Sequence, residues 1–152
     1  MDAIDYKILE CLRINARQKA SSISEQINLS VSAVIERIRK METSGIIEGY
    51  TVVLNQKQLG NDMVALMEVS LEHPKYYDAF TAKVKAHDNI FSCEYLTGDF
   101  DFMLKIQTDS PERLEQIHRQ IKSFEGVSAT RTHFVLKNVK NEITALPQEV
   151  IE

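Results

Sequence analysis

The sequence lacks tryptophan and has only 2 cysteines, 3 prolines and 5 glycines among 152 residues. Cys11 and Cys93 lie far apart with no histidine cluster near them, which excludes the usual structural zinc site. We interpret both as buried thiols of a cytosolic protein. The four histidines form no His-x-x-x-His pair, and no Ser/His pair, Cys/His pair or Gly-rich phosphate loop accompanies the two carboxylates Asp99 and Asp101. We therefore expect no metal site, no cofactor and no catalytic residues.

Long apolar runs and a strong charge of one sign are absent as well. No run approaches the roughly 18 apolar residues that span a bilayer, and the first residues are acidic where a signal peptide is basic. We expect a cytoplasmic protein that does not bind membranes. The net charge is −4, and the acidic excess lies after residue 60. Any binding of double-stranded DNA must therefore come from the local placement of basic residues.

The first 60 residues show the periodicity of helices rather than of strands. An apolar stripe from Ile4 to Leu12 predicts a first helix, with Asp2 as its N-cap and Asp5 in its first turn. The pattern Ser22-x-x-Glu25 is typical of a capping box and predicts the start of a second, short helix. Asn28 tolerates the left-handed backbone that ends a helix, so a tight turn follows.

A third helix is predicted from Ser30 to Ser44. Its apolar stripe contains Val31, Val34, Ile35, Ile38 and Met41, and Gly45 ends it. A short helix, a turn and a longer basic helix match a helix-turn-helix, in which the longer helix enters the major groove. A plain three-helix bundle with a solvated charged face is the alternative. The candidate DNA-binding residues are Ser30, Ser32, Ala33, Glu36, Arg37, Arg39 and Lys40.

The remainder of the chain alternates between strand and helix patterns. Residues 46–54 predict a strand, and residues 55–62 predict a hinge. The predicted order after the hinge is strand 63–71, helix 75–86, strand 90–96, strand 102–108, a helix beginning at Pro111, and strand 127–136. This βαββαβ order is that of the ferredoxin-like unit, whose sheet has one face bare of helices. Apolar residues on both faces of strand 63–71 predict that a second copy covers the bare face.

Two carboxylates lie close together in the segment "LTGDFDFML", between two of these strands. Asp99 and Asp101 suggest a divalent metal site or an acid/base pair, but no third acidic residue or catalytic partner is near. A structural hairpin turn is a second interpretation, because Gly-Asp is common in turns. A third is a loop that binds a free amino acid, in which an aspartate holds the ammonium group and backbone N–H groups hold the carboxylate.

Both halves contain motifs of one known family. In the first half these are Asp2, Asp5, Ile8 and Leu9, Ala16-Arg17, Leu29-Ser30-x-Ser32, Arg37, and Glu42-x-x-Gly45-Ile46-Ile47. In the second half they are Thr97-Gly98-x-x-Asp101, Thr130-x-Thr132-x-Phe134, Lys137 with Lys140, and Leu146-Pro147. In this order the chain resembles the Lrp/AsnC (leucine-responsive regulator) family. Asn28 departs from the glycine usual there, but asparagine tolerates the same backbone conformation.

The resemblance implies an α+β protein with an N-terminal winged helix-turn-helix and a C-terminal ferredoxin-like βαββαβ domain. The expected domains are 1–50 for DNA binding, 51–62 for a strand and hinge, and 63–152 for effector binding and oligomerisation. It implies a sequence-specific transcriptional regulator, not an enzyme, that forms homodimers and octamers and binds a small effector, mostly an amino acid, between dimers. The expected effector-binding residues are Thr97, Gly98, Asp99, Phe100 and Asp101, with Thr130 and Thr132 from an adjoining subunit.

Two other functions remain open on the sequence. Sirohaem decarboxylases resemble this family in both halves and would use a tetrapyrrole site with His and Arg. The Arg-bearing third helix argues against that enzyme. A DNA-compacting architectural protein without an effector is the other alternative, which the sequence pI of about 5.6 disfavours.

Overall fold

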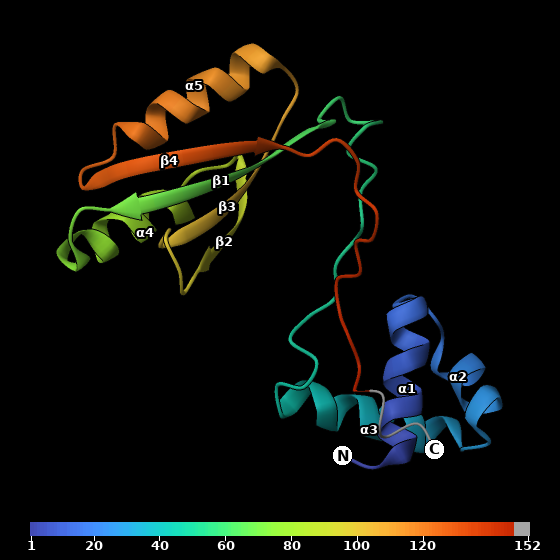
Figure 1. The fold of residues 1–152 in the computed structure, drawn as a ribbon. Helices are drawn as coiled ribbons and strands as arrows, with labels where there is room; N and C mark the ends of the chain where they lie inside the picture. The colour runs from blue at the N-terminus through green and yellow to red at the C-terminus, as the bar shows by residue number, and fades with distance from the viewer. Residues whose placement is uncertain (148–152) are drawn as a thin grey trace. The chain divides into compact units, whose positions relative to one another are not determined.

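A computed structural model of the protein describes residues 1–147, which form two compact units (Figure 1). The first unit contains residues 1–53 and the C-terminal segment 140–147. The second unit contains residues 54–139. Within residues 1–147, no helix has both the length and the apolar character needed to cross a membrane, and no three potential metal-ligating side chains come together.

The first unit is built on three helices, α1 (Ala3–Ile14), α2 (Ala20–Ile27) and α3 (Val31–Thr43). Its core is formed by four fully buried side chains, Ile8, Ile23, Val34 and Met41. The predicted N-cap of α1 is confirmed: Asp2 caps the helix and forms a capping box with Asp5. Asn28 has the predicted left-handed backbone, with φ of 53°. The helix-turn-helix arrangement therefore follows from local capping and from one apolar side on each helix.

Two expectations for these helices are wrong in detail. Helix α2 begins at Ala20 after Lys19, so Ser22 and Glu25 lie inside the helix and form no capping box. The helix extends further towards the N-terminus because Ala20 and the serines after it keep helical hydrogen bonding there, including the Ile23 N–H to the Lys19 carbonyl. In α3, only part of the predicted apolar stripe is buried, because Val31 and Ile35 remain exposed.

The predicted strand and wing over residues 46–54 are not present in this chain. These residues form no β-ladder, and Val52, Val53 and Leu54 are exposed by 73%, 72% and 54%. The segment has strand-like composition, but a strand needs a neighbouring strand for its backbone hydrogen bonds. Within one described chain, residues 46–54 have no such neighbour, and this physical reason overrides their β propensity.

The second unit has the predicted ferredoxin-like order. Its elements are β1 (Met63–Leu71), a 3-10 turn (Pro74–Tyr76) leading into α4 (Tyr77–Lys85), β2 (Ile90–Tyr95), β3 (Phe102–Thr108), α5 (Pro111–Lys122) and β4 (Val127–Phe134). The four antiparallel strands are arranged in the order β2-β3-β1-β4. The α+β class is thereby confirmed.

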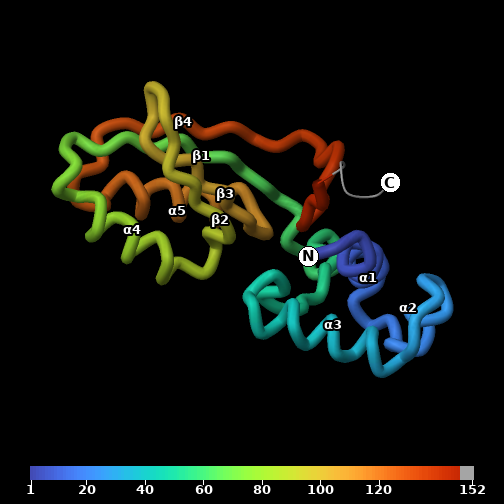
Figure 2. The backbone as a smooth tube through the Cα atoms, turned by 90° about the horizontal axis from the view of Figure 1, so that it is seen from below, coloured from blue at the N-terminus to red at the C-terminus, as the bar shows by residue number. Residues whose placement is uncertain are grey.

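Both helices of the second unit cover the same face of the sheet (Figure 2). Alternate residues of β1 and β3 point into this layer, and they pack against apolar residues of α4 and α5. The members of the core are Ala65, Met67, Val69, Phe102, Leu104, Ile106, Phe80, Val84, Leu114, Ile117 and Ile121. The other face, which we call the open face, carries half-buried Val64 and Leu66 next to charged groups.

The turn between α5 and β4 requires a glycine at position 126. Gly126 has a φ of +85°, and a Cβ atom placed there would overlap the ring of Tyr76. Its carbonyl oxygen accepts a hydrogen bond of 2.8 Å from the Glu72 N–H. The turn is therefore held against the end of β1 and the start of the α4 region by close packing that no side chain at 126 would permit.

Candidate functional sites

The solvent side of α3 carries most of the predicted DNA-binding residues. Ser32, Glu36, Arg39 and Lys40 are exposed, whereas Ala33 is half-buried. Ser30 caps the helix, because its hydroxyl oxygen accepts a hydrogen bond of 3.3 Å from the Ala33 N–H. The Ser30 and Ser32 hydroxyl groups lie 3.2 Å apart. The first turn of α3 thus presents small hydroxyl groups, and its later turns present cations.

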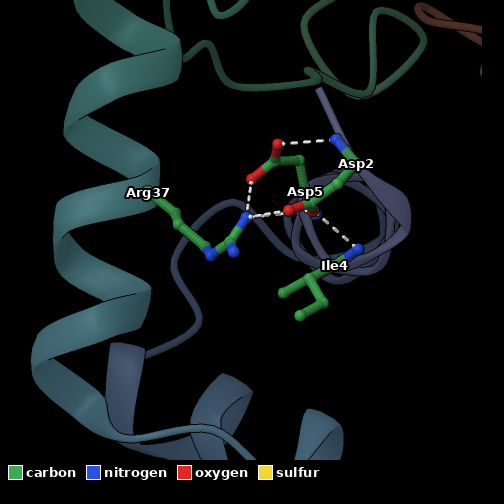
Figure 3. A network of polar contacts seen from close by, with 4 residues as sticks. All are labelled: Asp2, Ile4, Asp5 and Arg37. Carbon is green, nitrogen blue, oxygen red and sulfur yellow. Dashed lines mark hydrogen bonds and ion pairs between the residues drawn. The ribbon is translucent and has the colours of Figure 1, made fainter.

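Arg37 is engaged within the first unit (Figure 3). Its Nη1 atom donates to Asp2 Oδ1 at 2.9 Å, to Asp2 Oδ2 at 2.8 Å and to Asp5 Oδ1 at 2.7 Å. Asp2 Oδ1 also accepts from the Ile4 and Asp5 N–H groups, each at 2.9 Å. The helix cap of α1 and the guanidinium of α3 therefore share the same carboxylates.

The electrostatics of this Asp2–Asp5–Arg37 cluster follow from these contacts. The Asp5 N–H and the Arg37 guanidinium hold the pKa of the Asp2 carboxyl below its ordinary value. The carboxylates of Asp2 and then Asp5 raise the pKa of Arg37. Because α1 and α3 are joined by a fixed set of charged hydrogen bonds, the cluster sets how α3 lies on α1. The sequence pointed to all three residues but not to their pairing, since Arg37 lies more than thirty positions from both aspartates.

The Thr97–Asp101 turn joins β2 to β3 and is exposed at its tip. Thr97, Gly98 and Asp99 are exposed, and Gly98 has a φ of +134°. The Asp101 backbone pairs with two strands: its N–H donates to the Val69 carbonyl at 3.0 Å, and its carbonyl accepts from the Leu96 N–H at 2.7 Å. The turn therefore begins and ends on ordered backbone.

The two aspartates of this turn differ in what they contact. Asp101 is half-buried, and its Oδ2 atom accepts a hydrogen bond of 2.7 Å from the Leu71 N–H at the end of β1. Asp99 is exposed, and its backbone carbonyl, not its carboxylate, accepts from the Ser70 hydroxyl at 3.3 Å. Asp101 thus fastens the turn to the central strand, whereas the Asp99 carboxylate faces water.

Sequence reasoning missed a charged group beside this turn on the open face. The Arg131 guanidinium lies over the Phe100 ring, 4.9 Å from its centre. Glu68 Oε2 lies 3.6 Å from Arg131 Nη1 and 3.1 Å from His133 Nε2. The signal was present, because strand alternation in Thr130-Arg131-Thr132 puts Arg131 on the face opposite to the two threonines.

Thr130 and Thr132 lie on the helix-covered side of β4. Thr130 pairs with Val69, and Thr132 pairs with Met67, whose side chains are buried in the core. The Thr132 hydroxyl oxygen is buried and has no hydrogen-bond partner within residues 1–147. The structure therefore brings Phe100 next to β4, while the two threonine side chains point to the other face of the strand.

The chain matches known proteins over both units. Residues 1–42 match the AsnC-type helix-turn-helix domain, and residues 64–144 match the Lrp/AsnC ligand binding domain. The HTH-type transcriptional regulator FL11 of Pyrococcus furiosus is 35% identical over 97% of this chain and 96% of its own length. The leucine-responsive regulatory protein of Haemophilus influenzae is 32% identical over 92% of this chain and 86% of its own length.

Solved structures are similar over nearly the full length as well. A transcriptional regulator of Neisseria meningitidis in complex with L-Met superposes with a TM-score of 0.92 at 28% identity, covering 98% of this chain and 97% of that one. The AsnC protein of E. coli gives a TM-score of 0.87 at 29% identity, covering 93% and 95%. These proteins have the same two parts in the same order as this chain.

Proposed function

The chain belongs to the Lrp/AsnC family of transcriptional regulators, and from this premise we propose that it binds specific DNA sequences in response to an amino acid. The single observation that carries the DNA part is α3, whose solvent side presents Ser32, Glu36, Arg39 and Lys40 together. The L-Met complex of the similar regulator supports an amino acid as the effector class. We place this activity in the cytoplasm, without a catalytic step.

In this proposal α3 enters the major groove by its N-terminal end. The small side chains of Ser30, Ser32 and Ala33 allow close approach to the base edges, and Glu36 accepts a hydrogen bond from a cytosine amino group. Arg39 and Lys40 contact phosphates and fix the register. A dimer presents two such helices about 34 Å apart, to successive major grooves on one face of the DNA.

We assign Arg37 to positioning α3 rather than to a base contact. Its Nη1 atom already has three carboxylate oxygens within 2.9 Å, and these bonds would have to break before it reached DNA. Arg37→Ala should then abolish retardation of duplex DNA by changing how α3 lies on α1, while the core of the unit keeps the helices together. Asp5→Asn provides the decisive comparison. Removing a negative charge near DNA by itself strengthens binding, so weaker binding by Asp5→Asn would show that this carboxylate positions α3.

The DNA part is tested by the salt dependence of binding to duplex from the protein's own upstream region. Arg39→Ala and Lys40→Ala should each weaken binding and reduce the slope of log K against log salt by about one. Lys122→Ala, at an exposed position of α5, is the matched control and should leave the slope unchanged. Equal slopes for all of these proteins would refute the assignment of α3.

The effector part of the proposal rests on the turn and on β4. Gly98, Asp99 and Phe100 supply backbone N–H groups for a carboxylate, and Asp101 supplies a negative charge for an ammonium group. Thr97 belongs to the same turn, and Thr130 of an adjoining subunit completes the site. The Thr132 hydroxyl oxygen is buried on the helix-covered side of β4 and is not assigned to it. The Oδ2 atom of Asp101 is bonded to Leu71, so the ammonium group is assigned to Oδ1.

A thermal-shift screen with the natural amino acids, followed by calorimetry, tests this site. A ligand that binds only the folded protein raises its midpoint of unfolding. Asp101→Asn should abolish the shift, and Asp99→Asn should preserve it. Affinity within twofold of the wild type in Asp101→Ala would show that Asp101 does not hold the ammonium group. A screen without any hit would favour an architectural protein that needs no effector.

We also propose that the open face of the sheet pairs with a second copy and that the dimers assemble to an octamer. Half-buried Val64, Leu66 and Met103 lie on that face next to Glu68, Lys105 and Arg131. This mixture of apolar and oppositely charged groups suits a self-complementary interface. Light scattering of the full chain tests the assembly, and a stable monomer at micromolar concentration would refute it.

A further inference from the structure

Two large apolar side chains lie exposed on α3 among its polar residues. Val31 is 41% exposed and Ile35 is 53% exposed, one helical turn apart. Val34 and Met41 of the same helix are 0% and 2% exposed. The apolar side of α3 therefore extends beyond what the core of the first unit covers, towards the outer side of the helix.

The position of Ile35 on the helix places it beside the polar residues assigned to DNA. Residues three and four apart are neighbours on a helix surface, so Ile35 borders Ser32 on one side and Arg39 on the other. Val31 adjoins Ile35 towards the N-terminus of α3, the end that enters the groove. An apolar strip thus runs along one edge of the polar surface of α3.

Folding of this chain does not account for these two residues. β-branched side chains are weaker helix formers than alanine or leucine, because the helix restricts their rotation. An exposed isoleucine recovers little of that loss by burial, and neither residue belongs to the buried core of the first unit. A function in binding accounts for them better.

We propose that Ile35, supported by Val31, contacts the C5-methyl group of thymine in the major groove and so specifies a T·A pair in each half-site. This inference rests on the proposed binding of DNA by α3. Thymine carries the one apolar group on the major-groove edge, and an aliphatic side chain recognises it by burial rather than by a hydrogen bond. Arg39 and Lys40, on the next turn of α3, match the negative charge of the phosphate backbone beside the groove.

The experiment removes the methyl group from the DNA and the aliphatic group from the protein. A bound duplex is first selected from a randomised 30-bp library, and each thymine is then replaced in turn by deoxyuridine. Replacement at one or two positions in each half-site should weaken wild-type binding about fourfold, the factor that corresponds to burial of one methyl group. The same replacement should leave Ile35→Ala unaffected.

Two controls make the result specific. Ile14→Ala changes an exposed isoleucine of α1, with 75% exposure, and should keep the wild-type deoxyuridine profile. The salt slope of Ile35→Ala should equal that of the wild type, because no phosphate contact is lost. Thermal unfolding of Ile35→Ala checks that the variant is folded, and alanine favours the helix at this position.

Distinct results separate failure of this inference from failure of the proposed function. Absence of any selected duplex would overturn DNA binding itself. A wild type that binds DNA but ignores every deoxyuridine, or an Ile35→Ala variant that keeps the full penalty, would overturn the role of Ile35 alone. If the wild type ignores every deoxyuridine and Ile35→Ala loses the oligomer, the apolar strip would be assigned to a protein partner.

Discussion

Replacement of Asp101 tests whether the Thr97–Asp101 turn is held in place by one carboxylate. The Asp101 Oδ2 atom accepts a 2.7 Å hydrogen bond from the Leu71 N–H at the half-buried end of β1. A hydrogen bond to a charged group contributes about 1.5–3 kcal/mol, and partial access of water to the freed N–H reduces that figure. We expect Asp101→Ala to lower the free energy of unfolding of the second unit by about 1–3 kcal/mol.

Asp101→Asn should be milder, because the amide oxygen still accepts from Leu71 and only the charge is lost. The expected decrease is about 1 kcal/mol or less. For a unit of this size, a loss of about 2 kcal/mol lowers the midpoint of thermal unfolding by roughly 10 °C. Calorimetry of the full chain measures this shift, and hydrogen exchange of the Leu71 amide reports the broken bond directly.

Asp99→Ala is the matched control, since it removes a carboxylate from the same turn. Within residues 1–147 this carboxylate makes no hydrogen bond, and the bond from the Ser70 hydroxyl goes to the Asp99 backbone carbonyl. Its midpoint should stay within about one degree or two of the wild type, as for an ordinary surface substitution. Equal midpoints for Asp101→Ala and Asp99→Ala, with unchanged exchange at Leu71, would refute the structural role of Asp101. Asp101→Asn also separates stability from effector binding, because this variant keeps the fold and removes only the charge.

Three further predictions concern other parts of the chain. Gly126→Ala should destabilise the second unit by about 2–5 kcal/mol, from left-handed backbone and overlap with Tyr76. Gly60 has a φ of +81° and no atom near the place of a Cβ, so Gly60→Ala should lower the free energy of unfolding, measured by chemical denaturation, by only about 1–2 kcal/mol. Equal losses of stability in Gly126→Ala and Gly60→Ala would contradict the packing argument. Because the pKa of Asp2 is lowered in the folded protein, its carboxylate contributes stability that is present above about pH 4 and is lost as the pH falls through the folded-state pKa. The urea midpoint of Asp2→Asn should therefore fall less between pH 5 and 3 than that of the wild type. Thr132→Val should raise the free energy of unfolding by about 1 kcal/mol, because it removes a buried hydroxyl without a partner; a loss of stability would show that this hydroxyl has a bonding role.

Local signals in the sequence were sufficient for most of the fold. The bounds of β1 and β3 are those predicted, because each is a mainly apolar stretch of strand length that ends at polar or turn-forming residues. The start of α5 at Pro111 is also confirmed, and the structure adds Ser110 as its cap. In each case the information lies within a few residues, where propensity and capping act.

Features that depend on residues far apart in the chain could not be predicted from the sequence. Residues 46–54 have the composition of a strand, but pairing decides whether a strand forms. Arg37 was predicted to face DNA, whereas its contacts with Asp2 and Asp5 depend on how α3 packs on α1. The bond between Asp101 and Leu71 likewise depends on the register of β1 and β3. Position along a helix or strand predicts the direction of a side chain but not its partner.

The return of residues 140–147 to the first unit makes the second unit an insertion within the first. During synthesis, the three helices and their buried core emerge well before residues 140–147, so this segment joins the first unit only after residues 54–139 have been made. Arg13 and Glu142, whose Nη1 and Oε2 atoms lie 3.8 Å apart, meet only at that late step. A fragment that stops after α3 therefore lacks part of its own unit, and restoring residues 140–147 by a linker would measure what this segment contributes to DNA binding.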